Sequence, residues 1–334
     1  MRRIKITKDL CDFVERFNDN LFTSTRTVGF GSPQDRLNKL LLKVKPRKHK
    51  EYRLYIQKIL DEYDDILNAD PIKMQGLIAE FDAIVHNSQL SRKITGKKFS
   101  FHENIVEAMR YEDLRDKEFP EYLLNSDLRT CVYCNAQLAL VIEPVYYNKI
   151  KRKNRKKILA KLQLDHFYPK SKYPFLCTSF FNLYPTCANC NLAKGKDDAK
   201  FELYTTEDSL DPFIFWIDDE SILDYWISLD LKSLKIYLDS IDGDIDLLHN
   251  HNELFQIQKI YDAQKDIGEE LVWKFKANPS SYRHILEKTF QKIFPDPSVI
   301  DRMIIGNYSK PEETFKRPMA KYTQDIARQL KLIK

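Results

Sequence analysis

Hydrophobic positions recur at spacings of three and four residues through much of residues 1–125, which predicts α-helices there. Residues 47–67 and 71–87 fit two helices of this kind. Asp70 and Pro71 stand between them, in the order of an N-cap residue followed by the first helical residue. We therefore expect an N-terminal helical region over residues 1–125.

The pattern changes in residues 126–205. Apolar and β-branched residues are frequent at 136–147, which predicts a strand or a hairpin. Residues 162–169 alternate apolar and polar side chains as the end of a strand does, and 183–186 fit a short strand. A short helix is expected to begin near Ala188. This segment is therefore predicted to hold the strands of the protein.

Helical spacing returns in residues 206–334, most clearly at 252–275 and 282–294, with a last helix at 311–331. The whole chain thus reads as an α+β protein that is mostly α-helical. We expect a central module over residues 126–205, with helical regions on both sides.

Composition narrows the class of protein. No run approaches the roughly 18 consecutive apolar residues that a membrane helix needs, and the first residues lack the apolar stretch of a signal peptide. Six cysteines in 334 residues are too few for a disulfide scaffold. These features predict a cytoplasmic protein.

The positive charge is concentrated in the central module. Residues 126–205 carry 14 Lys and Arg against 6 Asp and Glu, whereas residues 206–334 carry 17 against 23. Residues 149–161 alone hold eight basic side chains. This run is either a solvated hairpin tip or a surface that grips backbone phosphates. On the second interpretation the nucleic-acid contacts are expected from Lys151, Arg152, Lys153, Arg155, Lys170, Lys172 and Lys194.

Four cysteines form two C-x-x-C pairs, which in a cytosolic chain indicate a metal site. The pairs are Cys131 with Cys134 and Cys187 with Cys190, and 52 residues separate them. That distance accommodates two strands and an insertion, so tertiary folding would bring the pairs together into a closed, tetrahedral, structural zinc site. Cys11 and Cys177 are interpreted as ordinary thiols.

The residues between the pairs carry candidate chemistry. Asp165 and His166 are adjacent at the predicted strand end, Asn182 precedes the next strand, and Asn191 directly follows Cys190. A hard divalent ion favours a carboxylate oxygen, and His is the simplest general base near neutral pH. From the first turn of a helix that begins near Ala188, the Asn191 amide could point towards Asp165 and complete a two-ligand site.

This segment resembles the ββα-metal motif of HNH endonucleases in its zinc-stapled form. The residues that carry the resemblance are Asp165, His166, Pro169, Ser171, Asn182, Leu183, Cys187, Cys190, Asn191, Lys194 and Gly195. The resemblance implies that His166 is the general base and that Asp165 and Asn191 hold the catalytic ion. It also implies that Asn182 holds the loop that orients His166.

The sequence departs from the usual HNH pattern in two places. Residues 172–175 read Lys-Tyr-Pro-Phe where many members have glycines, which puts the geometry of the loop in doubt. Asn191 stands where many members have His, and Asn is the weaker ligand.

The expected reaction is hydrolysis of nucleic-acid phosphodiester bonds with Mg or Mn as catalytic ion and zinc as structural ion. DNA is the preferred substrate because most HNH relatives cut it, and structured RNA such as tRNA is the second choice. The alternative is a zinc-stabilised nucleic-acid-binding or adaptor module without cleavage. The acidic, aromatic-rich region 206–334 suits contact with a partner protein better than contact with DNA.

The layout of helical flanks about this core, with the tail from Tyr308 to Leu330, is similar to the nuclease subunit of Septu-type antiphage systems. There the nuclease is paired with an ATPase, and related pairs accompany some retrons. The resemblance implies an effector nuclease of a defence complex with an ATPase partner.

Overall fold

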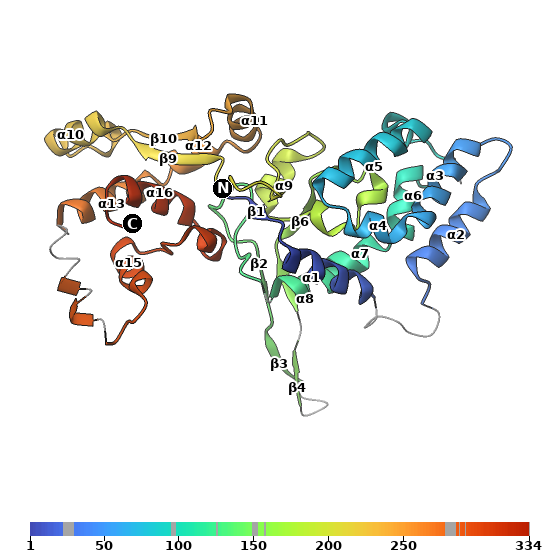
Figure 1. The fold of residues 1–334 in the computed structure, drawn as a ribbon, viewed down its shortest axis with the longest axis horizontal. Helices are drawn as coiled ribbons and strands as arrows, with labels where there is room; N and C mark the ends of the chain where they lie inside the picture. The colour runs from blue at the N-terminus through green and yellow to red at the C-terminus, as the bar shows by residue number, and fades with distance from the viewer. Residues whose placement is uncertain are drawn as a thin grey trace.

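The computed structural model describes residues 1–22, 30–94, 98–124, 126–148, 153–156, 158–277, 285–286, 288–290 and 292–333, with the backbone alone at 146–148 and 153–156. Helices dominate, and the described strands form two-stranded sheets. Figure 1 shows the N-terminal helices on one side, short strands in the middle and the C-terminal elements on the other side. The predicted α+β class with mostly helices is confirmed. Within the described ranges, no helix combines the length and apolarity needed to cross a bilayer.

Residues 1–125 are helical after one short strand. The elements are β1 (Ile4–Lys5), α1 (Lys8–Asp19), α2 (Pro33–Lys43), α3 (Lys50–Asp61), α4 (Tyr63–Asn68), α5 (Pro71–Ile84), α6 (Phe101–Ala108), α7 (Tyr111–Asp113) and α8 (Phe119–Leu124). Asp70 caps α5, and Pro71 is its first residue, as predicted. The helix expected over 47–67 is instead α3 followed by α4, because Glu62 leaves the helical conformation (φ −113°, ψ 23°).

Aromatic packing fixes the N-terminal helices to the central module. Phe81 of α5 stacks on Phe175 with ring centroids 3.9 Å apart, and Tyr55 of α3 meets Phe81 edge-on at 4.8 Å. All three side chains are buried. Phe175 lies in the segment between His166 and Asn182, so the helices support the loop of the candidate site from outside.

The predicted hairpin exists and is longer than expected. Strand β2 (Leu140–Ile142) pairs with β5 (Leu159–Lys161), and β3 (Val145–Asn148) pairs with β4 (Lys153–Lys156), both antiparallel. The basic run 149–161 therefore supplies the returning strands of the hairpin, which projects from the body of the protein (Figure 1).

A second strand pair and a helix follow the hairpin. Strand β6 (Gln163–His166) pairs antiparallel with β7 (Leu183–Thr186), so that Asp165 lies opposite Tyr184 and His166 opposite Leu183. Helix α9 (Ala188–Lys194) begins directly after β7 and packs against β6. The two strands and the helix start expected here are confirmed.

The C-terminal region contains a hairpin that the sequence pattern missed. Strand β8 (Tyr204–Thr205) ends the central module. The elements of the C-terminal region are β9 (Phe213–Ile217), α10 (Asp219–Ser228), β10 (Ile236–Ser240), α11 (Ile245–Phe255), α12 (Ile257–Asp262), α13 (Lys265–Ala277), α15 (Pro297–Ile305) and α16 (Ala320–Gln329). Strands β9 and β10 pair antiparallel. A short apolar run such as Phe213–Ile217 cannot be told from a helical segment by periodicity alone, which explains the miss.

Two expected C-terminal helices are divided. The stretch 252–275 spans α11, α12 and α13, with Gln256 in a left-handed conformation (φ 53°) between the first two. The stretch 311–331 is a 3-10 turn followed by α16, and Pro318 lies between them. Part of the expected helix 282–294 lies outside the described residues.

Short helical turns complete the fold. They are η1 (Asn87–Gln89), the π-helical turn η2 (Leu114–Glu118), η3 (Pro174–Leu176), η4 (Phe180–Asn182), η5 (Leu231–Ser233) and η6 (Pro311–Lys316). Buried apolar side chains of all three regions belong to one contiguous core. Strand β1 pairs in parallel with β8, and the Arg3 N–H donates to the Leu210 carbonyl, so the first residues pack beside the central and C-terminal elements.

Candidate active site

The four predicted cysteines meet in space. Cys131 and Cys134 lie in a turn before β2, Cys187 is the N-cap of α9, and Cys190 lies within that helix. All four are buried, and their sulfur atoms lie within 4.8 Å of one another. Tetrahedral zinc with Zn–S bonds of about 2.3 Å separates its sulfurs by about 3.8 Å, so this cluster can close around one zinc ion with small adjustments.

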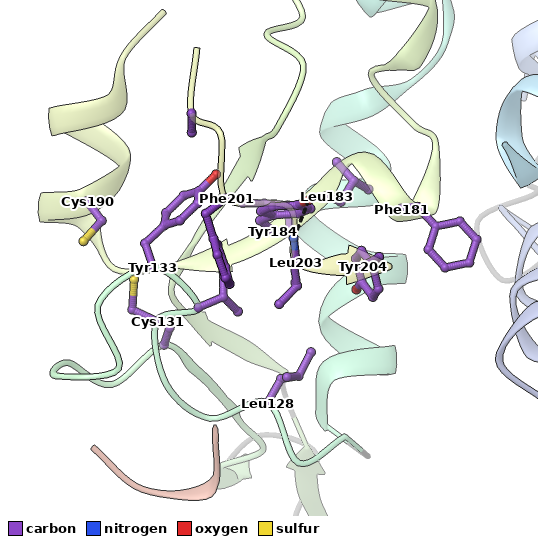
Figure 2. Packing of buried hydrophobic residues seen from close by; sticks show 14 of the residues in the cluster. Leu128, Cys131, Tyr133, Phe181, Leu183, Tyr184, Cys190, Phe201, Leu203 and Tyr204 are labelled. Atoms are coloured by element: carbon purple, nitrogen blue, oxygen red, sulfur yellow. Dashed lines mark hydrogen bonds between the residues drawn. The ribbon is translucent and has the colours of Figure 1, made fainter. Parts of the chain in front are cut away.

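The local backbone suits thiolate ligands. The backbone N–H of Cys190 donates to the Cys187 sulfur at 3.4 Å. Hydrogen bonds among the four thiols lower the pKa of Cys187 and raise that of Cys190, so the clustered thiols compete for the same protons. Figure 2 shows Cys131 and Cys190 approaching each other from the turn and from α9. The chemistry and spacing of these donors fit a structural metal.

Asn135 fastens the first cysteine turn to the C-terminal region. Its left-handed backbone (φ 50°) ends the turn, and its carbonyl accepts from the Met319 N–H at 2.7 Å. Its buried side chain donates to the Thr314 carbonyl at 2.8 Å and accepts from the Lys321 N–H at 3.0 Å. The C-terminal residues thus form part of the scaffold of the cysteine cluster.

Helices α11 and α12 hold the same turn from another side. His251 Nε2 donates to the Tyr133 carbonyl at 2.8 Å, and the Tyr261 hydroxyl donates to the Cys134 carbonyl at 2.7 Å. The Tyr133 ring stacks on Phe255 with centroids 4.4 Å apart. Tyr133 is therefore fixed in position by the C-terminal region.

Tyr133 reaches from the cysteine turn to Asp165. Its hydroxyl donates to Asp165 Oδ2 at 2.8 Å, and both side chains are buried. The Lys194 ammonium of α9 lies 3.2 Å from the same oxygen and donates to the His166 carbonyl at 2.7 Å. Burial raises the pKa of the Asp165 carboxyl, while the Lys194 charge and the Tyr133 hydrogen bond oppose that rise.

His166 lies at the end of β6 with its ring buried. Its Nε2 is 3.0 Å from the Cys177 carbonyl, so this nitrogen carries the ring proton and Nδ1 is the acceptor. The Tyr111 ring lies 4.6 Å from the His166 ring. Burial, with the nearby charge of Lys170, lowers the pKa of His166 to about 3, so the ring is neutral at pH 7.

Asn182 ties together the loop that follows His166. Its side-chain oxygen accepts from the Tyr168 N–H at 2.7 Å, and its amide donates to the Tyr168 and Leu176 carbonyls at 3.2 and 3.0 Å. The side chain is fully buried. Three hydrogen bonds from one side chain fix the loop that presents the Cys177 carbonyl to His166.

Asn191 lies in the first turns of α9 and is half-buried. It stands three residues before Lys194, and residues at this spacing are neighbours on a helix surface. Lys194 contacts Asp165, whereas the contacts of the described residues do not join the Asn191 side chain to Asp165. The structure thus brings Asp165, His166 and α9 together at one end of the strand pair.

The predicted nucleic-acid-binding lysines and arginines differ in their settings. The Lys170 ammonium lies 4.2 Å from the centre of the Tyr111 ring, and Lys172 is paired with Asp198 at 2.9 Å. Lys151 and Arg152 lie outside the described residues, and for Lys153 and Arg155 only the backbone in β4 is described.

We predicted that Lys194 contacts nucleic acid, and its position in the structure does not fit that prediction. The side chain is 0% exposed, and the ammonium is surrounded by Asp165 and the His166 carbonyl. A cation buried in this way cannot reach a phosphate at the surface, so Lys194 is a counter-ion of Asp165 here.

Sequence reasoning missed two residues of the site. Tyr133 stands inside the first C-x-x-C pair, and this position is the sequence feature that could have identified it as a site residue. Tyr111 contacts His166 from the N-terminal helices, 55 positions earlier in the chain, and no local motif marks it.

Comparisons with known proteins give one match among curated proteins. The chain is 34% identical over 80 residues to a protein described as Septu protein PtuB from Bacillus thuringiensis. The matched segment spans 24% of this chain and 24% of that protein. No family model matches, and no solved structure matches. The match and the four-cysteine cluster together support a relationship to Septu proteins.

Proposed function

We propose that this chain is a metal-dependent nuclease of the HNH type that hydrolyses phosphodiester bonds. The observation that carries the proposal is the succession of β6, β7 and α9, with Asp165 and His166 at the end of β6 and α9 packed beside them. This succession is the one expected of a ββα-metal module, and a metal bound by the four cysteines would tie the helix to the turn of Cys131 and Cys134. The relationship to PtuB agrees with this assignment.

His166 is the general base of the proposed reaction. Its Nε2 proton is engaged by the Cys177 carbonyl, which leaves Nδ1 to accept a proton from the attacking water. Asn182 holds the loop that carries this carbonyl, so it fixes the tautomer and the orientation of the ring. Asn182 is a positioning residue in this account.

Asp165 and Asn191 would hold the catalytic divalent ion, Mg or Mn. When bound, such an ion supplies Lewis-acid stabilisation of the charge that develops on the scissile phosphate and the leaving oxygen. Lys194 and Tyr133 both contact the Asp165 carboxylate, so they orient it and limit the charge it presents. The hairpin with its basic run, together with Lys170 and Lys172, would contact the nucleic-acid backbone.

A cleavage assay tests the proposed function. Purified, zinc-loaded protein is incubated with supercoiled plasmid DNA and, separately, with a folded RNA such as tRNA, and Mg or Mn is titrated. Cleavage of either substrate that requires the added ion supports the proposal, and DNA is the expected preferred substrate. Binding of both substrates with no cleavage under any ion would instead identify a zinc-stabilised binding module.

Tyr133→Phe is expected to weaken the catalytic ion site. Without the hydroxyl, Asp165 loses its 2.8 Å hydrogen bond, and outer-shell losses of this kind cost about 10- to 100-fold in metal affinity or activity. The Mn concentration for half-maximal cleavage should therefore rise about tenfold, with recovery of the rate at saturating Mn.

Tyr204→Phe is the matched control for this measurement. Tyr204 is also fully buried, and its hydroxyl has no hydrogen-bond partner among the described residues. Equal Mn dependence for wild type and both variants would show that the Tyr133 hydroxyl plays no part in ion binding.

The resemblance to the nuclease subunit of Septu-type systems, together with the match to PtuB, leads us to propose that this chain acts in an antiphage defence complex with an ATPase partner. Helix α10 offers a surface for that partner. Leu223 and Ile227, four residues apart on one face, are 64% and 84% exposed, and Leu229 beyond them is 68% exposed. Exposed apolar residues grouped in this way are typical of protein interfaces, and the surrounding acidic residues favour a partner with a basic rim.

Ile227→Asp is expected to abolish co-purification with the ATPase partner, because a charge would replace the most exposed apolar side chain of α10. The measurement is a pull-down of the co-expressed genomic neighbour. Leu42→Asp is the control, since Leu42 is 81% exposed on α2 in the N-terminal region. A complex that survives Ile227→Asp but not Leu42→Asp would move the interface to the other side of the protein.

A further inference from the structure

A cavity of about 630 Å³ lies between the N-terminal helices and the segment after His166. Its wall includes Phe99, His102, Val106, Tyr111 and Lys170. This volume falls within the range of about 300 to 1,000 Å³ that is usual for sites of small ligands. The cavity is therefore large enough to hold one nucleotide.

The cavity and the candidate active site share a wall. The Tyr111 ring lies 4.6 Å from the His166 ring, and the Lys170 ammonium lies 4.2 Å from the centre of the Tyr111 ring. The Tyr111 hydroxyl donates to the Leu164 carbonyl of β6, which fixes the ring against the strand. A group bound beside Lys170 would thus be next to the proposed general base.

Three cations and four carboxylates line the cavity, namely Arg36, Arg110 and Lys170 and Glu103, Glu107, Glu112 and Asp113. Arg36 pairs with Glu107 at 3.7 Å, and Arg110 pairs with Asp113 at 2.9 Å. The Glu103 side chain accepts from the backbone N–H of Ser100 in the capping box of α6. Lys170 has no ion pair among the described residues, so it is the lining cation that remains available to a phosphate.

The apolar part of the cavity wall suits a planar ligand. Phe99 is 40% exposed and Val106 is half-buried, so both offer accessible surface to the cavity. Stacking of a base on an aromatic side chain is a common way to hold an unpaired nucleotide, and it tolerates different bases.

We propose that this cavity binds one unpaired nucleotide of the substrate strand, with the base against Phe99 and Val106 and a phosphate at Lys170. The inference rests on the proposed nuclease function and names its substrate class. The preferred substrate has an unpaired nucleotide next to the cleaved bond, in a loop, a bulge or a single strand. A uniform duplex would leave the cavity without a ligand.

Binding is tested with the His166→Ala protein, so that the substrate survives. Oligonucleotides carry 2-aminopurine either in a hairpin loop or within a duplex of the same sequence, and both fluorescence and affinity are measured. We expect the loop form to bind about tenfold more tightly and its fluorescence to change on binding. Phe99→Ala should remove most of that difference, and Val106→Phe, which fills the cavity, should do the same.

The outcomes separate this proposal from the proposed function. Equal affinity for loop and duplex, or full loop binding by both cavity variants, would overturn the nucleotide site. Competition by a free mononucleotide at lower concentration than the loop would also overturn it, in favour of a small-molecule ligand. Loop preference in a protein whose wild type cuts nothing would support the cavity and contradict the nuclease. Leu138→Ala, an exposed residue outside the cavity lining, is the control.

Discussion

His166→Ala should lower the rate of phosphodiester cleavage by about 10²- to 10⁴-fold, the usual contribution of a positioned general base. The reason is geometric: His166 is the neutral, buried imidazole whose Nε2 is held by the Cys177 carbonyl, which leaves Nδ1 as the proton acceptor of the ring. The measurement is the initial rate on the substrate that the wild type cuts, at saturating Mg or Mn.

Two controls separate lost chemistry from lost structure. The variant should keep its zinc and unfold within a few degrees of the wild type, and His249→Ala, on the exposed face of α11, should cut at the wild-type rate. A His166→Ala protein that cuts as fast as the wild type would remove His166 from the role of base.

Cys190→Ser is expected to have the largest effect on stability. It removes one of four thiolates within 4.8 Å of one another, and structural zinc sites bind with apparent free energies of about 10–16 kcal/mol in zinc-finger peptides. At about 1.4 °C per kcal/mol for a chain of 334 residues, loss of half of this energy would lower the unfolding temperature by roughly 10 °C. The cleavage rate should fall as well, because Cys190 precedes Asn191 in α9.

The measurements are zinc content per chain and the thermal unfolding midpoint. Wild type should contain close to one zinc per chain, and Cys190→Ser should contain much less. Cys11→Ser provides the matched control, since Cys11 lies in α1 and outside the cluster. A stable, zinc-free Cys190→Ser protein with full activity would show that the cluster is not a structural staple.

The features that sequence predicted depend on local patterns. The strand at 163–166, the short strand at 183–186 and the helix from Ala188 each follow from spacing within a few residues. The Asp70 cap of α5 is equally local. The two cysteine pairs are far apart in the chain, yet their C-x-x-C spacing predicted that they share one metal site.

The features that escaped prediction depend on tertiary packing. Asn135 contacts Thr314 across 179 positions, and His251 contacts Tyr133 across 118, so no local window contains both partners. The C-terminal region, for which we expect contact with a partner protein, also holds the cysteine turn. A lysine in a basic segment was expected at the surface, and only the packing of α9 on β6 reveals that Lys194 is buried.

The central claim is that Asp165 and Asn191 hold a divalent ion beside His166. Anomalous diffraction from crystals of the zinc-loaded protein soaked in Mn tests it most directly. The account predicts a manganese peak, distinct from the zinc peak, within bonding distance of an Asp165 carboxylate oxygen and the Asn191 amide oxygen, with Lys194 shifted from its present contact. A well-ordered crystal in which manganese avoids Asp165, at a concentration that supports cleavage in solution, would contradict it.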